Sequence, residues 1–575
     1  MSDRAVFFDP SHRRWWWIKR IGTLFGLFAV VTVSIWLVSL FTLPFLPGIK
    51  GITTPINRVL KRSIRLPVHQ RRKEQYAATK YGQKVLAEYG KLKKEQSARA
   101  ALPPIRGGNI VAAFYAPWQE TGLHSLRWNA DHMTHLLPSW VHLQQGAKGL
   151  DLHDWDPLMV PHNNDVLQIA RSNNLNIVPV FSNAELSDFD PQRAHALLID
   201  PALQTNIIFQ LRQWVLANRF QGINVDFENL SDPDWPLLIP FLQRMKSAFA
   251  PYHLVVSVDL GRNDHSRPLW ESAAGICDFI VVMAYDEHGS GSKPGPIASM
   301  EWYRGVLADA ARAIPREKLV VGLANYAYDW EEGRDWADPL TYQGALITAA
   351  KYREGEKPED VIDFDDRYLN PTFSYIDDDD KQHEVWFLDA ITAANQWMIA
   401  QTYNPRGVAI WVLGSTDPSI WDFFHRRRLS QSPNMSELQK IEFPYDIEFV
   451  GDGEIAHVVS NPTPGSRSLE LDPKTGLALD ESYTKFPASY VIARTGYKPG
   501  AIALTIDDGP AEPYTSQMLD ELKQSNVKAT FFLIGQNAER YPSLVRRIWN
   551  EGHEIGNHTY THPNLGAMPL REARL

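Results

Sequence analysis

Cysteine is almost absent from this chain of 575 residues, where Cys277 is the only one. An intramolecular disulfide is therefore excluded, and because Cys277 stands in an apolar run we expect it to be a small core residue. An excess of charge is also missing: the net charge of −9 is modest for this length, so nothing global points to nucleic acid as a partner. The composition is that of ordinary globular domains, and the length predicts about two to four of them.

Charged residues are missing from Ile21 to Ile49, and residues 21–43 form an apolar stretch long enough to cross a bilayer as a helix. Three tryptophans at positions 15–17 precede it as an interfacial belt. No small-x-small cleavage site follows it, which predicts an uncleaved signal anchor. Basic residues flank the stretch almost equally on both sides, so charge alone does not fix its orientation.

A basic stretch and a polar helical pattern follow the apolar segment. The lysines and arginines of residues 50–73 could hold anionic lipid headgroups, and a solvated basic linker explains them equally well. Residues 74–101 are rich in Ala, Lys, Glu and Gln and are predicted to form a helical stalk, which Pro103 and Pro104 close.

From about residue 107 short apolar strands alternate with amphipathic helices. Eight strands with helices between them predict a (β/α)8 barrel of the TIM type with one long insertion. An open doubly wound sheet is compatible with the pattern, but no glycine-rich phosphate fingerprint follows the first strand. The expected strands are Ile110–Tyr115, Trp140–Leu143, Ile177–Phe181, Gly222–Glu228, Leu254–Asp259, Phe279–Ala284, Leu319–Ala324 and Val408–Val412.

The fourth expected strand carries polar residues at every second position. The pleat sends Asn224, Asp226 and Glu228 to one face of this strand. Polar groups that point into a barrel are costly unless they have a function, whereas on a solvated edge strand they would cost nothing. Glu228, at the carboxyl end, would lie where barrel active sites lie, and an ionised Asp226 beside it would hold its proton more tightly.

The same strand resembles the signature of the family 18 glycoside hydrolases, the chitinase-like barrels, which is Asp-Gly-x-Asp-x-Asp-x-Glu. Its last two acids are retained as Asp226 and Glu228, whereas the first two have become Gln221 and Asn224. The resemblance extends over residues 107–425 to the motifs Met283-Ala284-Tyr285-Asp286 and Gly322-Leu323-Ala324-Asn325-Tyr326 and to Trp411.

The resemblance implies a role for each of these side chains. Glu228 would protonate the glycosidic oxygen while the N-acetyl group of the substrate attacks the anomeric carbon, and Asp226 would orient that acetamide. Tyr285 would hydrogen-bond the acetamide. Substrate binding would also involve Asn224, Met283 and Asp286, with Trp411 as the floor of a sugar subsite. Asn224 departs from the family pattern because it can hydrogen-bond Asp226 but cannot take up its proton.

A second constellation lies near the end of the sequence. Asp507 and Asp508 stand in Thr-Ile-Asp-Asp-Gly-Pro, and His558 and His562 follow about fifty residues later. One carboxylate and two imidazoles can hold a divalent cation, and the second carboxylate can deprotonate water, which is a design for metal-assisted hydrolysis. The aspartates alone would be compatible with an acidic turn.

These residues resemble the polysaccharide deacetylases of the NodB homology family. By that resemblance Asp508, His558 and His562 bind the metal, with zinc as the expected ion, and Asp507 is the general base. The family's later motifs, including a histidine that acts as general acid, are not in the sequence. This predicts a fragment of a longer protein, whose remainder could include a family 2 glycosyltransferase module.

We therefore expect an α/β protein that hydrolyses N-acetylglucosamine-containing polysaccharide, namely chitin oligomers, peptidoglycan or exopolysaccharide, and also de-N-acetylates it. A glycan-binding protein without turnover and a scaffold for polymer export stay open as alternatives. The catalytic domains would be extracytoplasmic, at a bacterial inner membrane. The expected parts are a cytoplasmic tail (1–20), an anchor (21–43), a basic segment and stalk (44–105), a family 18-like barrel (106–430), a β-rich connector (431–495) and an incomplete NodB domain (496–575).

Overall fold

The computed structural model describes residues 108–563 apart from residues 120, 148, 158, 161, 186–187, 263–265, 354, 428 and 443–446. It also describes Leu565 and five helical residues between Lys84 and Lys91. No helix in this part of the chain is long and apolar enough to span a membrane. The predicted anchor and basic segment lie outside the described residues. Of the predicted stalk, Leu86 packs against the barrel core and Lys84 pairs with Glu301 at 3.0 Å.

The chain divides into two compact units. Unit 1 contains the residues up to Glu442 together with Pro464–Pro487. Unit 2 contains Phe443–Thr463 and Ala488–Leu575. The predicted connector of residues 431–495 is thus shared between the two units and does not form a body of its own.

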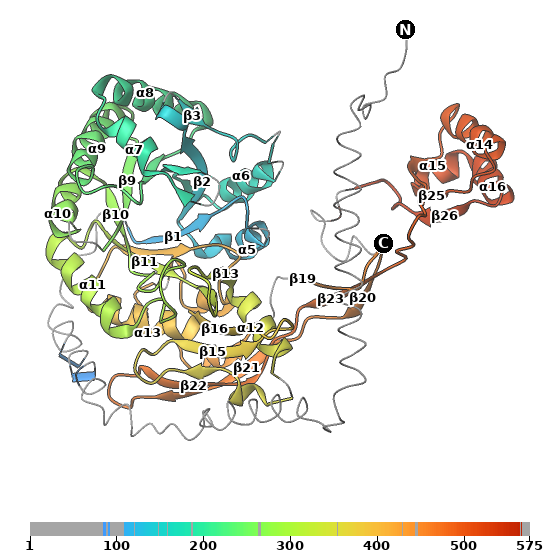
Figure 1. Cartoon of the computed structure of the whole chain (residues 1–575). Coiled ribbons are helices and arrows are strands. Elements are labelled where there is room, and N and C mark those ends of the chain that lie inside the picture. The colour runs from blue at the N-terminus through green and yellow to red at the C-terminus, as the bar shows by residue number, and fades with distance from the viewer. Residues whose placement is uncertain are drawn as a thin grey trace, which may run out of the picture. The chain divides into compact units, whose positions relative to one another are not determined.

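Unit 1 is built on a closed barrel of parallel strands, which confirms the predicted (β/α)8 architecture (Figure 1). Neighbouring strands pair in the order β1-β17-β11-β10-β9-β8-β5-β2, and a β1–β2 pairing closes the ring. The strands are β1 (Ile110–Tyr115), β2 (His135–Leu143), β5 (Val180–Ser182), β8 (Gly222–Asp226), β9 (Val255–Gly261), β10 (Phe279–Met283), β11 (Leu319–Ala324) and β17 (Gly407–Trp411).

The third predicted strand is split by a proline. Residues 177–181 were expected to form one strand, but β4 (Asn176–Ile177) ends before β5 begins. Pro179 lies between them and has no N–H to donate to the ladder, although its carbonyl still accepts from Asn224 N at 2.9 Å.

Helices surround the barrel and bury apolar faces against its strands. The main core lies between these two layers, and Cys277 is buried in it as predicted, where burial raises the pKa of its thiol to about 12. The helices are α5 (Gly122–Asn129), α6 (Asn163–Ser172), α7 (Pro191–Leu198), α8 (Pro201–Asn218), α9 (Trp235–Phe249), α10 (Ser266–Ile276), α11 (Met300–Ala313) and α13 (Ala390–Gln401).

The expected long insertion lies between β11 and β17. It forms a five-stranded antiparallel sheet in the order β13-β12-β16-β15-β14, and α12 (Tyr342–Lys351) packs on it. Its strands are β12 (Tyr326–Glu331), β13 (Asp338–Thr341), β14 (Asp363–Phe364), β15 (Pro371–Ile376) and β16 (Gln382–Phe387). Because β12 starts two residues after β11 ends, this sheet begins at the carboxyl end of the barrel.

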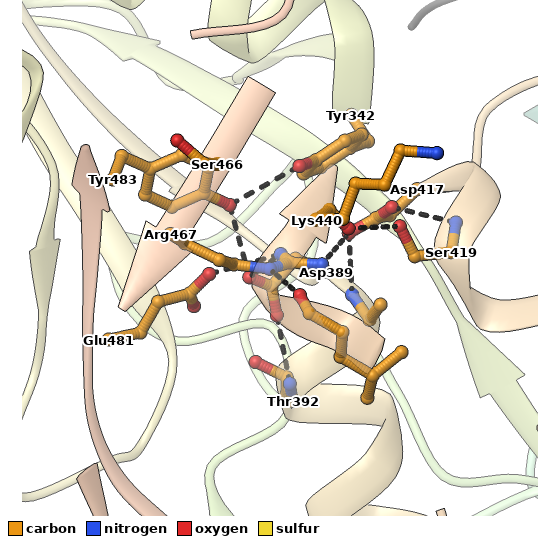
Figure 2. A network of polar contacts seen from close by, with 12 residues as sticks. Tyr342, Asp389, Thr392, Asp417, Ser419, Lys440, Ser466, Arg467, Glu481 and Tyr483 are labelled. Carbon is orange, nitrogen blue, oxygen red and sulfur yellow. Dashed lines mark hydrogen bonds and ion pairs between the residues drawn. The ribbon is translucent and has the colours of Figure 1, made fainter. Parts of the chain in front are cut away.

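A hairpin from the second half of the predicted connector completes unit 1. Strands β21 (Gly465–Leu471) and β22 (Ala478–Lys485) form a three-stranded sheet with β18 (Lys440–Ile441). Arg467 of β21 is fully buried and pairs with Asp389 at the start of α13, Asp417 after β17 and Glu481 of β22, at 3.2, 2.9 and 3.0 Å (Figure 2). The hairpin is therefore joined by buried charges to two loops at the carboxyl end of the barrel.

Unit 2 contains two small sheets. Strands β19 (Ile447–Val450), β23 (Tyr490–Thr495) and β20 (Ile455–Ser460) form the first sheet. The second sheet is parallel, in the order β24-β25-β26, and has strands β24 (Thr505–Gly509), β25 (Thr530–Leu533) and β26 (Glu554–Asn557). Helices α14 (Tyr514–Gln524), α15 (Gly535–Arg540) and α16 (Pro542–Asn550) connect these strands.

Candidate functional site

Two acids at the carboxyl end of β8 form the centre of the barrel site. Asp226 is the last residue of β8 and is 6% exposed, and Glu228 follows it half-buried. The Asn183 side chain fixes the backbone of Glu228, because it accepts from Glu228 N and donates to Glu228 O, both at 3.0 Å. Burial, and then the charges of Asp226 and Asp286, raise the pKa of Glu228 well above its usual range. A carboxyl group that holds its proton in this way can act as a general acid.

A third acid, which the sequence pattern did not single out, lies beside them on the neighbouring strand. Asp259 of β9 is 3% exposed, and Asn224 Nδ2 donates to its Oδ2 at 2.5 Å. The hydroxyl of Ser257 donates to Asn224 Oδ1 at 2.7 Å. Asn224 is fully buried with both ends of its amide occupied, so it holds Asp259 and does not line a surface that substrate could reach. The expected bond from Asn224 to Asp226 is not among the contacts of the described residues.

The Met283 to Asp286 motif begins at the last residue of β10, and its Tyr285 and Asp286 lie near the same acids. The half-buried Tyr285 has a strongly raised pKa, caused by burial and then by the charges of Asp259, Glu228, Asp226 and Asp286, so its hydroxyl stays a donor. Tyr326, the first residue of the insertion sheet, donates its hydroxyl to Asp286. The insertion therefore contributes directly to the site.

Trp411, the residue expected to floor a sugar subsite, lies at the end of β17 and is half-buried. Its ring packs edge-on against Phe114 of β1, with ring centroids 5.2 Å apart. The loop that follows is fixed from two sides, because Asp417 N donates to Asn325 Oδ1 at 2.5 Å and the Asp417 carboxylate pairs with Arg467. The barrel thus gathers Asp226, Glu228, Tyr285, Asp286 and Trp411 at one end, where active sites of this fold lie.

The other strands of this end add a polar chain that was also not predicted. Ser182 of β5 stands opposite Asp226 in the register of β5 and β8. His142 Nδ1 lies 2.8 Å from Ser182 Oγ, and His142 Nε2 lies 3.0 Å from Asp154 Oδ2. His142 and Ser182 are polar residues at or next to the carboxyl end of their strands, and this position is the signal that could have identified them.

The second candidate site lies on unit 2. A bulge in the pairing of β24 and β25 falls between Ile506 and Gly509, and Asp508 adopts a left-handed φ of 67° there. Asp508 Oδ1 lies 3.2 Å from His558 Nε2 and 3.5 Å from His562 Nε2. The three predicted ligands therefore converge, although Asp508 and His558 are 50 residues apart in the sequence.

These three side chains suit a divalent metal. Their donor atoms all lie within 4.8 Å of one another, and one carboxylate with two imidazoles is a zinc-type donor set that leaves a coordination position open. The described residues contain one other such group, Asp131, His132 and His425. In that group His425 Nδ1 already accepts from Arg427 N at 3.0 Å, which puts the proton of the neutral ring on Nε2 and leaves no lone pair there for a metal.

Comparison with known proteins finds a family match for each of the two regions that carry these sites. Residues 110–416, just over half of the chain, match the family model described as glycosyl hydrolases family 18, and residues 495–574 match the one described as polysaccharide deacetylase. The cortical fragment-lytic enzyme of Bacillus subtilis is 26% identical over 276 residues, which are 46% of this chain and 63% of the relative. A peptidoglycan-N-acetylglucosamine deacetylase of Bacillus cereus is 54% identical over 96 residues, 16% of this chain and 35% of the relative.

Among solved structures, the spore cortex-lytic enzyme SleL of Bacillus megaterium aligns with 25% identity over 56% of this chain and 75% of that chain, at a TM-score of 0.48. This chain spans less than two thirds of the length of both curated relatives named above.

Proposed function

We propose that this chain, which belongs to family 18 of the glycosyl hydrolases, cleaves the glycosidic bonds of an N-acetylglucosamine-containing polysaccharide in its barrel. Both families that match the chain consist of hydrolases. The observation that carries the proposal is the pair Asp226 and Glu228 at the carboxyl end of β8, where burial and neighbouring charges raise the pKa of Glu228.

In the barrel Glu228 gives its proton to the glycosidic oxygen as the bond to the anomeric carbon breaks. The carbonyl oxygen of the substrate's own N-acetyl group attacks that carbon, so no second protein carboxylate is needed as nucleophile. Asp226 accepts the acetamide N–H and stabilises the positive charge, and the Tyr285 hydroxyl donates to the acetamide. Glu228 then takes a proton from the water that opens the intermediate.

We further propose that unit 2 removes the N-acetyl group from the same sugar. Asp508, His558 and His562 would hold a divalent metal, with zinc as the proposed ion, which when bound polarises the amide carbonyl and lowers the pKa of water. Asp507, adjacent to Asp508, would accept the proton of the attacking water. One activity uses the acetamide and the other removes it, so both recognise one substrate class.

Peptidoglycan is the substrate we favour within that class, because the B. cereus relative is named for peptidoglycan N-acetylglucosamine. We also propose that residues 21–43 anchor the protein in a bacterial inner membrane with both units outside the cytoplasm. The support is the uncharged apolar stretch and the location of such glycans. Fusing a reporter that is active only outside the cytoplasm after residue 105 or after residue 575 tests this orientation, and an inactive reporter at both positions would contradict it.

Incubation of the full chain with N-acetylglucosamine oligomers and with peptidoglycan fragments tests both activities by mass spectrometry. Shortening of the chains reports the barrel, and loss of acetyl groups reports unit 2. Glu228→Gln should abolish shortening and leave deacetylation unchanged, whereas His558→Ala should do the reverse. If neither wild-type activity is detected while the oligomers bind, the chain is a glycan-binding protein.

A further inference from the structure

On its own strand, Asp226 has no neighbouring acid with which to share a proton. The carboxyl group is buried, and its Oδ1 has no hydrogen-bond partner in the described part of the structure. The family 18 pattern has an acid two residues earlier, but here that residue is Asn224, whose amide group neither releases nor takes up a proton as a carboxyl group does. To accept the acetamide N–H of the substrate, Asp226 has to be ionised, and the proton that it gives up then needs another acceptor.

Asp259, on the adjacent strand β9, is positioned to share a proton with Asp226. In the pairing of β8 with β9, Asn224 stands opposite Ser257 and Val225 opposite Val258, so the next pair is Asp226 and Asp259. Side chains at paired positions of neighbouring parallel strands point to the same face, about 4.8 Å apart at the backbone. Asp259 Oδ1 is also buried without a hydrogen-bond partner among the described residues. Two buried carboxylates this close cannot both be ionised without a large cost.

The surroundings of Asp259 fix it in place. Its Oδ2 accepts from Asn224 Nδ2, and Asn224 Oδ1 accepts from the hydroxyl of Ser257. All three side chains are at most 3% exposed. Asn224 stands where the family pattern has an acid. Its side chain therefore holds Asp259, the acid on the neighbouring strand.

We propose that Asp259 is a positioning residue that shares one proton with Asp226 and keeps that proton when Asp226 turns to accept the acetamide N–H of the substrate. This inference rests on the proposed glycosidase function. Only a proton moves: it passes from the Asp226–Asp259 pair to Asp259 alone as the oxazolinium-type intermediate forms, and it returns when water opens that intermediate. Asp226 is then a carboxylate at the stage at which positive charge develops on the acetamide.

Two variants of the full chain test the proposal. Asp259→Asn removes the proton acceptor and keeps the size of the side chain, and the double variant Asn224→Asp/Asp259→Asn moves the acid back to β8. We expect Asp259→Asn to lower kcat on N-acetylglucosamine oligomers on the order of 10- to 100-fold with little change in KM. The double variant should recover at least about tenfold of that loss, because it restores a carboxyl next to Asp226.

The control is Asp309→Asn, the same chemical change on the exposed face of α11, where Asp309 pairs with Arg262 and Arg312. It should leave kcat unchanged. Thermal unfolding identifies any variant that does not fold. If Asp259→Asn does not fold, the double variant decides alone, since it retains one buried amide and one buried carboxyl, and an inactive folded double variant would then overturn the proposal.

The possible results separate this inference from the proposed function. If Glu228→Gln is inactive while Asp259→Asn has wild-type kcat, the glycosidase stands and the role of Asp259 is wrong. A loss in Asp259→Asn that the double variant does not recover also overturns the exchange. If wild type and Glu228→Gln both lack hydrolysis, the proposed function itself fails.

Discussion

Replacement of Arg467 by methionine should lower the free energy of unfolding of unit 1 by about 3–5 kcal/mol, the usual loss when one partner of a buried ion pair is removed. Arg467 and its three carboxylate partners are all fully buried. Methionine fills a similar volume but leaves Asp389 and Asp417 without a cation. It also leaves the carbonyl of Leu438 without the Arg467 Nε donor, which lies 2.7 Å away.

The matched control is Glu481→Gln. Burial, and then the charge of Asp389, raise the pKa of Glu481 well above its usual range, and glutamine has the size and the neutral charge of the protonated form that this shift favours. We expect a loss of about 1 kcal/mol or less. The assay is urea and thermal unfolding of each variant followed by circular dichroism, with a drop in Tm on the order of 10 °C for Arg467→Met. A loss below about 1 kcal/mol in Arg467→Met would refute the assignment of the network as an anchor.

The difference in unfolding free energy between wild type and Glu481→Gln should depend on pH with a defined sign. A carboxyl whose folded pKa lies above its unfolded value of about 4.5 contributes stability below that value and loses it as pH rises through the folded pKa. The glutamine side chain of the control variant does not titrate. The unfolding free energy of wild type minus that of Glu481→Gln should therefore decrease as pH rises above about 4.5, and a difference that increases with pH would contradict the direction of the shift.

Three further predictions concern the two sites. Because the charge of Asp286 contributes to the raised pKa of Glu228, Asp286→Asn should move the basic limb of the kcat/KM profile to lower pH, and a move to higher pH would argue against Glu228 as the acid. His558→Ala should weaken zinc binding about 100-fold or more in a chelator competition, whereas the exposed His457→Ala should bind as wild type does. Trp411→Ala should raise KM for oligomers about tenfold, equivalent to about 1.4 kcal/mol, with a smaller effect on kcat, and an unchanged KM would exclude a sugar subsite there.

Much of the barrel could be predicted because local patterns determine it. Residues 110–115 and 319–324 are strands with the predicted bounds, since each is a short apolar run that is buried on both faces. The start of β2 was missed because Pro138 interrupts its apolar run, and a proline normally argues against a central strand. The hairpin of Arg467 was placed in a connector because its partners Asp389 and Asp417 are 78 and 50 residues away, and no local pattern records such contacts.

The site shows the same division between local and distant information. The expected metal ligands Asp508, His558 and His562 lie close together, as their motifs predicted, because the spacing of these motifs is a local property of the sequence. Asp259 was recognised only as the end of a strand. The role of Asp259 depends on the register of β9 against β8, which places Asp259 beside Asp226. This register cannot be read from the sequence of either strand alone. Asn224 was assigned to substrate for the same reason.

The division of residues 443–487 between the two units has a practical consequence for how the protein can be taken apart. The chain passes from one unit to the other at residues 442/443, 463/464 and 487/488, so no single cut separates them. An expression boundary at residue 430 would remove Arg467 and leave the carboxylates of Asp389 and Asp417 buried without their cation. A single nick in the segment 443–463 would cut the chain between the barrel and the 464–487 hairpin. The fragment that carries Asp508, His558 and His562 would then stay attached to the barrel only through the contacts of that hairpin, such as the buried pairs of Arg467 with Asp389 and Asp417.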